Sequence, residues 1–387
     1  MRSNLGFFSD EKFRSIFFQT LVIGLFALGI FFVVNTTAYN LEKRNIATGW
    51  SFLQNPAGFD ISFSPFLEFK STDTHLKVYF VGVLNTLLVS VTGCIAATIL
   101  GFLLGIVRLS SNWLLSRLVY IYVEFSRNVP LLLQIILWYS ILIQLPRVKQ
   151  SLQVLDVFYI SNRGLYSPRP IFESGFSYIS IAIVLALISS FLINRWAKKR
   201  QDKTGQQFPV FSSSIGLIFV VPLILFFILG SPMSFEHPEL KGFNFKGGLV
   251  IRPEFIAMFL ALSIYTAAFI SEIVRAGIMS VSKGQREASA AIGLKQTWIM
   301  RLIIIPQALR VIVPPLTSQY LNLTKNSSLG IAVGYADLVH GFGGISLNQT
   351  GQAIECMVIV MATYLTISLT ISFFMNIYNR SIQFKEK

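Results

Sequence analysis

The sequence predicts an all-α polytopic membrane protein with about eight transmembrane helices, and two observations carry this prediction. Of the 387 residues, 53% are hydrophobic and only 13% are charged, which is about half of the charged share of an ordinary soluble domain. Several apolar runs approach the roughly 20 residues that cross the hydrocarbon core of a bilayer. Because these runs are continuous and do not alternate with polar residues, a β-barrel is not expected.

Eight candidate spans follow one another along the chain. The first is too long for a signal peptide, and no small-residue cleavage site follows it, so we interpret it as a span. The second contains Ala97, Gly101 and Gly105 at four-residue spacing, which favours close helix packing, although both residue types are common in membrane helices. The spans are expected at 16–38, 79–107, 129–145, 175–194, 212–231, 253–274, 306–329 and 353–379.

The distribution of basic residues predicts the orientation of these spans. An even number of spans places both termini on one side of the membrane. If that side is the cytoplasm, the inner segments hold more of the 32 Lys and Arg residues than the longer outer loops do, as the positive-inside rule requires. Arg127 is assigned to an inner segment in this scheme. The net charge of +14 is then explained by cytoplasmic loops, and no nucleic-acid partner is expected.

The sequence contains no pattern that indicates a bound metal or cofactor. Cys94 and Cys356 lie inside apolar runs, and the three histidines occur in unrelated places. A disulfide framework, a paired-cysteine metal site and a histidine-rich metal site are therefore not expected. The phosphate-binding pattern G-x-x-x-x-G-K-[ST] is also absent, so the chain is not expected to bind ATP through such a loop.

A polar stretch of small residues, "SKGQREASAAIG" at 282–293, lies between two apolar runs. Its alanines favour a helix, on which Ala288, Ala291, Ile292 and Lys295 would share one face. Gly293 permits a turn that a Cβ would hinder, and Pro306 is expected to end the helix before the chain re-enters the membrane. We predict a short helix-turn-helix that docks into another protein; an ordinary amphipathic connector is the alternative.

The spacing of these residues resembles the EAA loop of ABC-importer permeases. The family pattern EAA-x3-G-x9-I-x-L-P is matched by 287–289, Gly293, Ile303 and 305–306, and it departs at Ser289 and Ile305. "YTAAFISEIVRAGI", "PQALRVIVPPL" and "TKNSSLGIAVGYADL" resemble the polar amino-acid permeases of the histidine/glutamine type. "RLSSNWLLSRLVYIYVEFSRNVPLLLQ" and "SNRGLYSPRP" resemble more narrowly the AapQ/BztB-type permease subunit of general L-amino-acid transporters. The resemblance covers about residues 75–387.

The resemblance implies a fold and a function. The fold is a five-helix type I importer core, in which the loop is a coupling helix that docks on a separate ATP-binding ATPase subunit. The function is ATP-driven import of L-amino acids across a bacterial inner membrane by a non-enzymatic subunit that itself binds no cofactor. The implied partners are that ATPase, a second permease subunit, a periplasmic amino-acid-binding protein and the lipid bilayer. The expected coupling residues are Glu287, Ala288, Ser289, Ala291, Ile292, Gly293 and Lys295.

Span seven has a polar second half, which we predict to line a substrate path. Pro314 and Pro315 are expected to break its helix, and freed backbone groups at membrane depth require a cavity lined by protein or water. The polar side chains could instead bond neighbouring helices, and Lys325 could be a structural charge paired with Glu355. The candidate path residues are Thr317, Gln319, Asn322, Lys325, Asn326 and Ser327.

The motifs also suggest a domain organisation. Residues 1–74 would form an N-terminal span and an outer loop, and 75–387 the permease domain. That domain would contain a two-span insertion at about 146–252, whose outer loops could contact a soluble binding protein, and the coupling loop at about 282–306. A stand-alone secondary transporter would call for buried acidic residues in paired inverted repeats, which the sequence lacks. A channel is a further alternative, which one sequence does not test.

Overall fold

The computed structural model describes residues 11–43 and 48–383. Its internal contacts divide the chain into two units. One unit combines Met1–Ile136 with Met258–Lys387, and the other is Leu137–Ala257.

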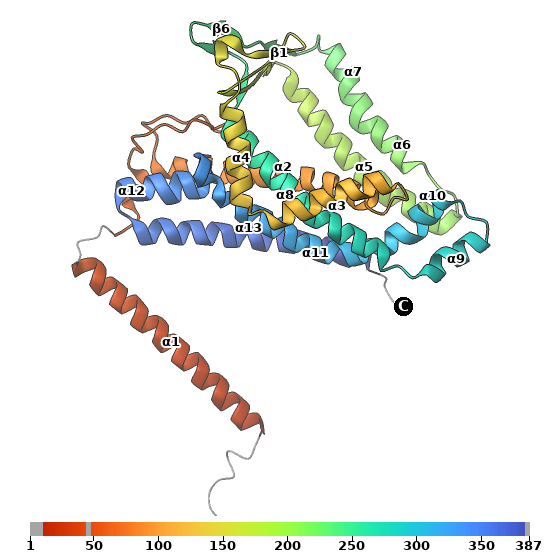
Figure 1. Ribbon diagram of the computed structural model, residues 1–387, viewed down its shortest axis with the longest axis horizontal. Helices are drawn as coiled ribbons and strands as arrows, with labels where there is room; N and C mark the ends of the chain where they lie inside the picture. Colours follow the sequence, from red (N-terminus) through yellow and green to blue (C-terminus); the bar gives the residue numbers. More distant parts are fainter. Residues whose placement is uncertain (1–10, 44–47, 384–387) are drawn as a thin grey trace, which may run out of the picture. The chain divides into compact units, whose positions relative to one another are not determined.

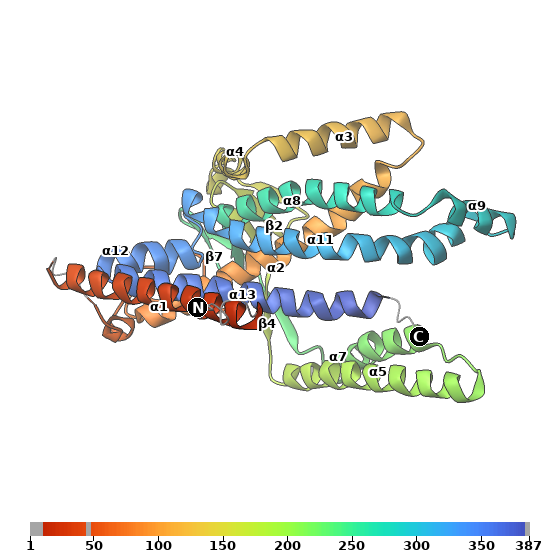
Figure 2. The ribbon, with the colours of Figure 1, turned by 90° about the horizontal axis from the view of Figure 1, so that it is seen from below.

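The first unit is built from long apolar helices. Together with short connecting helices, they are α1 (Glu11–Lys43), η2 (Ser51–Gln54), α2 (His75–Val107), α3 (Trp113–Asn128), most of α4 (Leu131–Ile143) and α8 (Pro253–Met279), α9 (Lys283–Ala291), α10 (Gln296–Trp298), η5 (Ile299–Ile304), α11 (Ile305–Asn326), η6 (Ser327–Val333), η7 (Leu338–Ser346), α12 (Leu347–Thr350) and α13 (Ala353–Ile382). Helices α11 and α13 lie side by side in both views (Figure 1, Figure 2).

The predicted number of spans agrees with the structure. In the described residues, seven helices are long and apolar enough to cross a membrane, or eight if α3 and α4 together form one broken span. The expected span three, 129–145, corresponds to α4, which follows the helix α3 at a bend of 106°. Pro130 stands at this bend and lacks a backbone N–H. Arg127 therefore lies in a helix of this pair and not in a connecting segment.

The small residues of α2 pack against α8, as their spacing predicts. A Cβ added at Gly101 would lie 2.6 Å from the Cβ of Ile270. A Cβ added at Gly105 would lie 2.8 Å from the carbonyl oxygen of Ser271 and 2.8 Å from the Cβ of Val274. All three distances are shorter than van der Waals contact, so only glycine permits this approach of the two backbones.

Proline does not interrupt the helix of span seven, contrary to our expectation. Residues 305–326 form one helix, α11, with Pro314 and Pro315 inside it. Pro306 lies in the first turn of α11, directly after the π-helical turn η5, so the helical run continues through it despite its missing N–H. Helical structure therefore runs without a gap from Gln296 to Val333. The change of helix type comes at Ser327, where α11 passes into the 3₁₀-helix η6.

The second unit contains two apolar helical segments and several short strands. The strands were not predicted from the sequence. The helices are α5 (Phe176–Thr204), α6 (Val210–Ile215), the π-helix η4 (Gly216–Val220) and α7 (Val221–Ile228); a short 3₁₀-helix, η3, covers Val148–Gln150. The strands are β1 (Leu152–Val154), β2 (Phe158–Ser161), β3 (Gly164–Ser167), β4 (Arg169–Phe172), β5 (Met233–Glu236), β6 (Glu239–Lys241), β7 (Asn244–Lys246) and β8 (Leu249–Ile251). Figure 1 shows α5 beside the α6–α7 segment.

The strands join two loops of the second unit, 144–175 and 229–252, into one folded region. Strands β1, β2, β3 and β8 form an antiparallel sheet in that order, so β8 from the second loop pairs with β3 from the first. Strand β4 pairs in the same way with β5. Buried Tyr166 and Phe245 pack together with Val148 beneath these strands. The two loops are therefore one structure, although 60 or more residues separate the paired strands in sequence.

Candidate functional site

The predicted docking loop folds as a short helix and a tight turn after α8. Helix α9 ends at Ala291, and Gly293 adopts φ +82°, a left-handed conformation in which a side chain is strained. The hydroxyl of Ser289 is turned inward and donates to the carbonyl oxygen of Gln285 at 2.5 Å. The N–H of Leu294 donates to the carbonyl oxygen of Ser289 at 3.3 Å. These bonds fix how the chain leaves the helix.

Most of the predicted coupling residues are exposed, but they do not all share one helical face. Glu287, Ala288 and Ala291 lie exposed on α9, and Ile292 directly after it is 77% exposed. Lys295 lies beyond the turn, as the N-cap residue of α10, because Gly293 ends the helix before a second turn could bring Lys295 onto the same face. Ser289 is buried within the loop. The loop therefore presents small and apolar side chains before Gly293 and the charged Lys295 beyond it.

The polar half of α11 divides between an exposed face and a buried face. Asn322 and Lys325 are exposed, at a spacing that places them on one side of the helix. Thr317, Gln319 and Asn326 are half-buried, and the Thr317 hydroxyl is bonded to the carbonyl oxygen of Val313 at 3.4 Å. The structure therefore gathers Asn322 and Lys325 on one surface, with the half-buried residues beside them.

Ser327 belongs to the buried face of this region. Its side chain is fully buried, and its hydroxyl donates to the carbonyl oxygen of Thr324 at 2.7 Å and lies 3.3 Å from the hydroxyl of Tyr364. Lys325 makes no ion pair within residues 11–43 and 48–383. Glu355, the alternative partner, is buried and accepts a hydrogen bond from the N–H of Gly49 at 2.6 Å.

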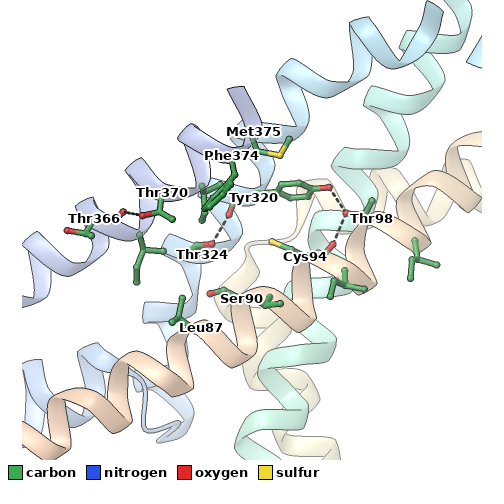
Figure 3. A pocket seen from close by; sticks show the side chains of 15 residues that line it. Leu87, Ser90, Cys94, Thr98, Tyr320, Thr324, Thr366, Thr370, Phe374 and Met375 are labelled. Carbon is green, nitrogen blue, oxygen red and sulfur yellow. Dashed lines mark hydrogen bonds between the residues drawn. The ribbon is translucent and has the colours of Figure 1, made fainter. Parts of the chain in front are cut away.

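A cavity of about 690 Å³ lies between α2, α11 and α13. Figure 3 shows hydroxyl groups from all three helices around it; the Thr98 hydroxyl lies 2.8 Å from that of Tyr320. The side chains that line it are otherwise apolar, apart from Cys94, and none is charged. A zwitterionic ligand would leave both of its charges unpaired in such a cavity, at a large desolvation cost. This cavity therefore suits an apolar ligand or a helix surface better than a free amino acid.

Ion pairs join α2 to α8 near the end of α8 that leads into α9. Glu272 binds Arg275 at 2.5 Å and also contacts the guanidinium of Arg108. Arg108 adds a link to the neighbouring helix that helix spacing alone does not predict.

The sequence analysis did not identify Asp337, a fully buried carboxylate after η6. It caps η7 by accepting a hydrogen bond from the N–H of His340 at 2.8 Å, and it accepts a second from the hydroxyl of Tyr364 at 3.3 Å. Burial raises the pKa of Asp337 to about 6, although these hydrogen bonds favour its charged form. The next residue, Leu338, donates its N–H to the hydroxyl of Thr86 at 3.1 Å. Asp337 thus ties the segment between α11 and α13 to α13, and Leu338 ties it to α2.

The described part of the chain contains no candidate metal site. No group of three or more His, Cys, Asp or Glu side chains is placed there to hold a metal ion.

Long apolar helices, close glycine packing between them and an exposed loop of small residues define a polytopic membrane protein of the transport-permease class. Residues 182–384 match the family model described as binding-protein-dependent transport system inner membrane component. This chain belongs to that family of ABC-importer permeases.

Three curated relatives match nearly the whole chain. The general L-amino acid transport system permease protein AapQ of Rhizobium johnstonii is 49% identical over 98% of this chain and 94% of its own length. The putative amino-acid ABC transporter permease protein YhdX of Escherichia coli is 46% identical over 98% of this chain and 97% of its own. The glutamate/glutamine/aspartate/asparagine transport system permease protein BztB of Rhodobacter capsulatus is 42% identical, with 98% and 96% covered.

Proposed function

We propose that this chain is a permease subunit of an ATP-driven importer that carries L-amino acids. The relatives AapQ and BztB are named for amino-acid transport, and they are similar to this chain over nearly its full length. The chain would not hydrolyse ATP itself. A separate ATPase would do so, and this chain would convert the closure of that ATPase into alternating access of a membrane path.

The single observation that carries this proposal is the exposed loop around α9. Its small side chains, Ala288 and Ala291, allow a cleft of another protein to approach the backbone closely, and the exposed Ile292 offers an apolar anchor. Ser289 and Gly293 would contribute by holding the shape of the loop, since one is bonded inside it and the other makes its turn. Glu287 and Lys295 would flank the contact with opposite charges.

The same proposal implies the remaining partners and the orientation of the chain in the membrane. A second permease subunit would complete the path, and a soluble amino-acid-binding protein would deliver substrate from outside. Both termini would lie in the cytoplasm of a bacterium, with the chain in its inner membrane. The core would be residues 75–387 after an N-terminal span in 1–74, with 146–252 as a two-span insertion whose sheet region faces the binding protein, and 282–306 as the coupling loop.

The substrate path would follow the exposed polar face of α11. Asn322 and Lys325 would face the path directly, because an exposed charge on a membrane helix is costly unless it faces water or protein. Thr317, Gln319 and Asn326 would border it. Ser327 would act by shaping the end of α11, as its hydroxyl is held by Thr324 and Tyr364.

The coupling role is tested by replacing Gly293 with valine, since a β-branched residue is strained at φ +82°. We expect the Gly293→Val complex to assemble but to lose most of its amino-acid uptake, while its ATPase continues to hydrolyse ATP. Gly205→Val is the matched control, because Gly205 also has positive φ (+70°) and an added Cβ there would meet nothing within 4 Å. Normal uptake by Gly293→Val in proteoliposomes would count against the docking role.

A further inference from the structure

A polar hollow of about 320 Å³ lies where the end of α2, the start of α3 and the last turns of α8 meet. It is separate from the exposed loop around α9 and from the polar face of α11. Its volume is at the lower end of the range for small-ligand sites. The residues that shape it include Arg108, Trp113, Ser116, Arg117, Tyr120 and Arg275.

The hollow carries more positive than negative charge. Glu272 is the carboxylate that pairs with its arginines, and both Arg108 and Arg275 share it. Three arginines and one glutamate leave a surplus of two positive charges. Arg117 makes no ion pair in the described part of the chain. Guanidinium groups that are held this close together repel one another unless an anion binds between them.

The tyrosine ring at the centre of the hollow brings two of these guanidinium groups together. Arg108 and Arg117 each lie 5.2 Å from the centre of the Tyr120 ring. The negative face of an aromatic ring stabilises a nearby cation, which offsets part of the repulsion between the two arginines. Guanidinium groups bind phosphate through paired N–H donors. The hollow is therefore preorganised for a phosphate group.

The surroundings of the hollow favour a lipid phosphate over a soluble one. Trp113, at its rim, is 75% exposed, and Leu114 and Leu118 beside it are 57% and 55% exposed. Tryptophan is enriched where membrane helices meet the headgroup layer, and the exposed leucines provide an apolar surface for acyl chains. Basic pockets between membrane helices are a known way to hold anionic headgroups.

We infer that this hollow binds the phosphate of an anionic phospholipid, in the leaflet on the side of the coupling loop. Arg117 supplies the charge that no protein carboxylate neutralises, while Arg108 and Arg275 complete the cradle. Only the choice of leaflet rests on the proposed function and orientation; the binding itself does not. The bound lipid would brace α3 against the end of α8, four residues before α9 begins.

The experiment measures lipid binding to the intact complex purified in a neutral detergent and stripped of loosely held lipid. Native mass spectrometry is used to titrate phosphatidylglycerol, phosphatidylcholine and inorganic phosphate. We expect phosphatidylglycerol to bind in preference to the other two. Arg117→Gln should weaken its binding about five-fold, which is the contribution of one basic residue near an anionic membrane surface. Arg117→Lys should keep most of the affinity, because it retains the charge.

The matched control is Arg380→Gln, which removes an exposed arginine near the end of α13, away from the hollow. Its affinity for phosphatidylglycerol should equal that of the unmodified complex.

Equal weakening by both glutamine variants would overturn the inference, because the effect would then be one of net charge. Inorganic phosphate that binds as tightly as the lipid would reassign the hollow to a soluble anion. Loss of the ATPase subunit from Arg117→Gln, with lipid binding unchanged, would reassign it to a protein contact. Uptake is not measured, so failure of the proposed transport function would leave each result interpretable.

Discussion

Replacing Gly105 by alanine should destabilise the helical core, although alanine is the better helix former. The new methyl group would lie 2.8 Å from the carbonyl oxygen of Ser271 and 2.8 Å from the Cβ of Val274. Neither atom is the end of a flexible side chain, so α2 and α8 must separate. Overpacking of this kind costs about 1–3 kcal/mol, while the gain in helix propensity is about 0.5–1 kcal/mol. The net loss is therefore on the order of 1 kcal/mol.

The assay is thermal unfolding of the purified complex in detergent, followed by size-exclusion chromatography with a fluorescent tag. A loss of this size should lower the midpoint by about 2–4 °C, by analogy with soluble chains of a few hundred residues. Gly24→Ala in α1 is the control, because its new Cβ would meet nothing within 4 Å. A midpoint for Gly105→Ala that equals or exceeds that of Gly24→Ala would refute the claim that glycine sets the distance between α2 and α8.

Three further predictions concern other parts of the chain. Burial raises the pKa of Asp337 from 3.8 to about 6, so the folded state binds this proton more tightly than the unfolded state does. The free energy of unfolding should therefore fall by roughly 3 kcal/mol as the pH rises from about 4 to 6, and it should stay level at higher pH. Asp337→Asn should flatten that part of a curve of unfolding midpoint against pH, and an unchanged slope would reject Asp337 as its source. Lys325→Met should assemble normally but change uptake or its selectivity; poor assembly that Glu355→Gln restores would instead make Lys325 a structural charge. An alkaline phosphatase fusion should be active at residue 240 and inactive at 200, and the opposite pattern would reverse the proposed orientation.

The helices were the most predictable part of this fold, because each long apolar run has few alternatives to spanning a bilayer. The stripe of Ala97, Gly101 and Gly105 also predicted a real contact, since small residues four apart necessarily share one helix face. The helix before span three, α3, was not predicted. Residues 113–128 are amphipathic, and only the partner surface on α8, where Ala268 packs against Val119 and Val123, accounts for them as a helix, which bends by 106° into α4.

The sequence did not predict contacts between residues that are far apart in the chain. The strands of the second unit are three or four residues long, too short for an alternating pattern to stand out. Their stability depends on partners such as β3 and β8, which are distant in the chain. Asp337 was missed for the same reason: its short motif gives no sign that Thr86 and Tyr364 lie next to it in the fold.

The stretch 282–293 was predicted correctly as a helix and a turn, because Gly293 and the alanines act locally. The prolines of span seven were misjudged, because prolines inside a membrane helix are tolerated when neighbouring helices support the backbone. For the proposed substrate path, the sequence supplied only a list of polar residues. The structure separates that list into exposed Asn322 and Lys325 and buried Ser327.

The unbroken helical run from Gln296 to Asn326 has a mechanical consequence. At about 1.5 Å per residue, a segment of this length forms a rod roughly 45 Å long, with the exposed loop at one end and Lys325 near the other. When such a segment moves as one body, a tilt of a few degrees at the loop becomes a displacement of a few ångströms at Lys325. The π-helical turn η5 is the one place in this run where the hydrogen-bond register differs from an α-helix, and a shift there would rotate the polar face of α11 about its own axis. The same rod can thus transmit a push as tilt or as rotation, depending on whether η5 holds its register.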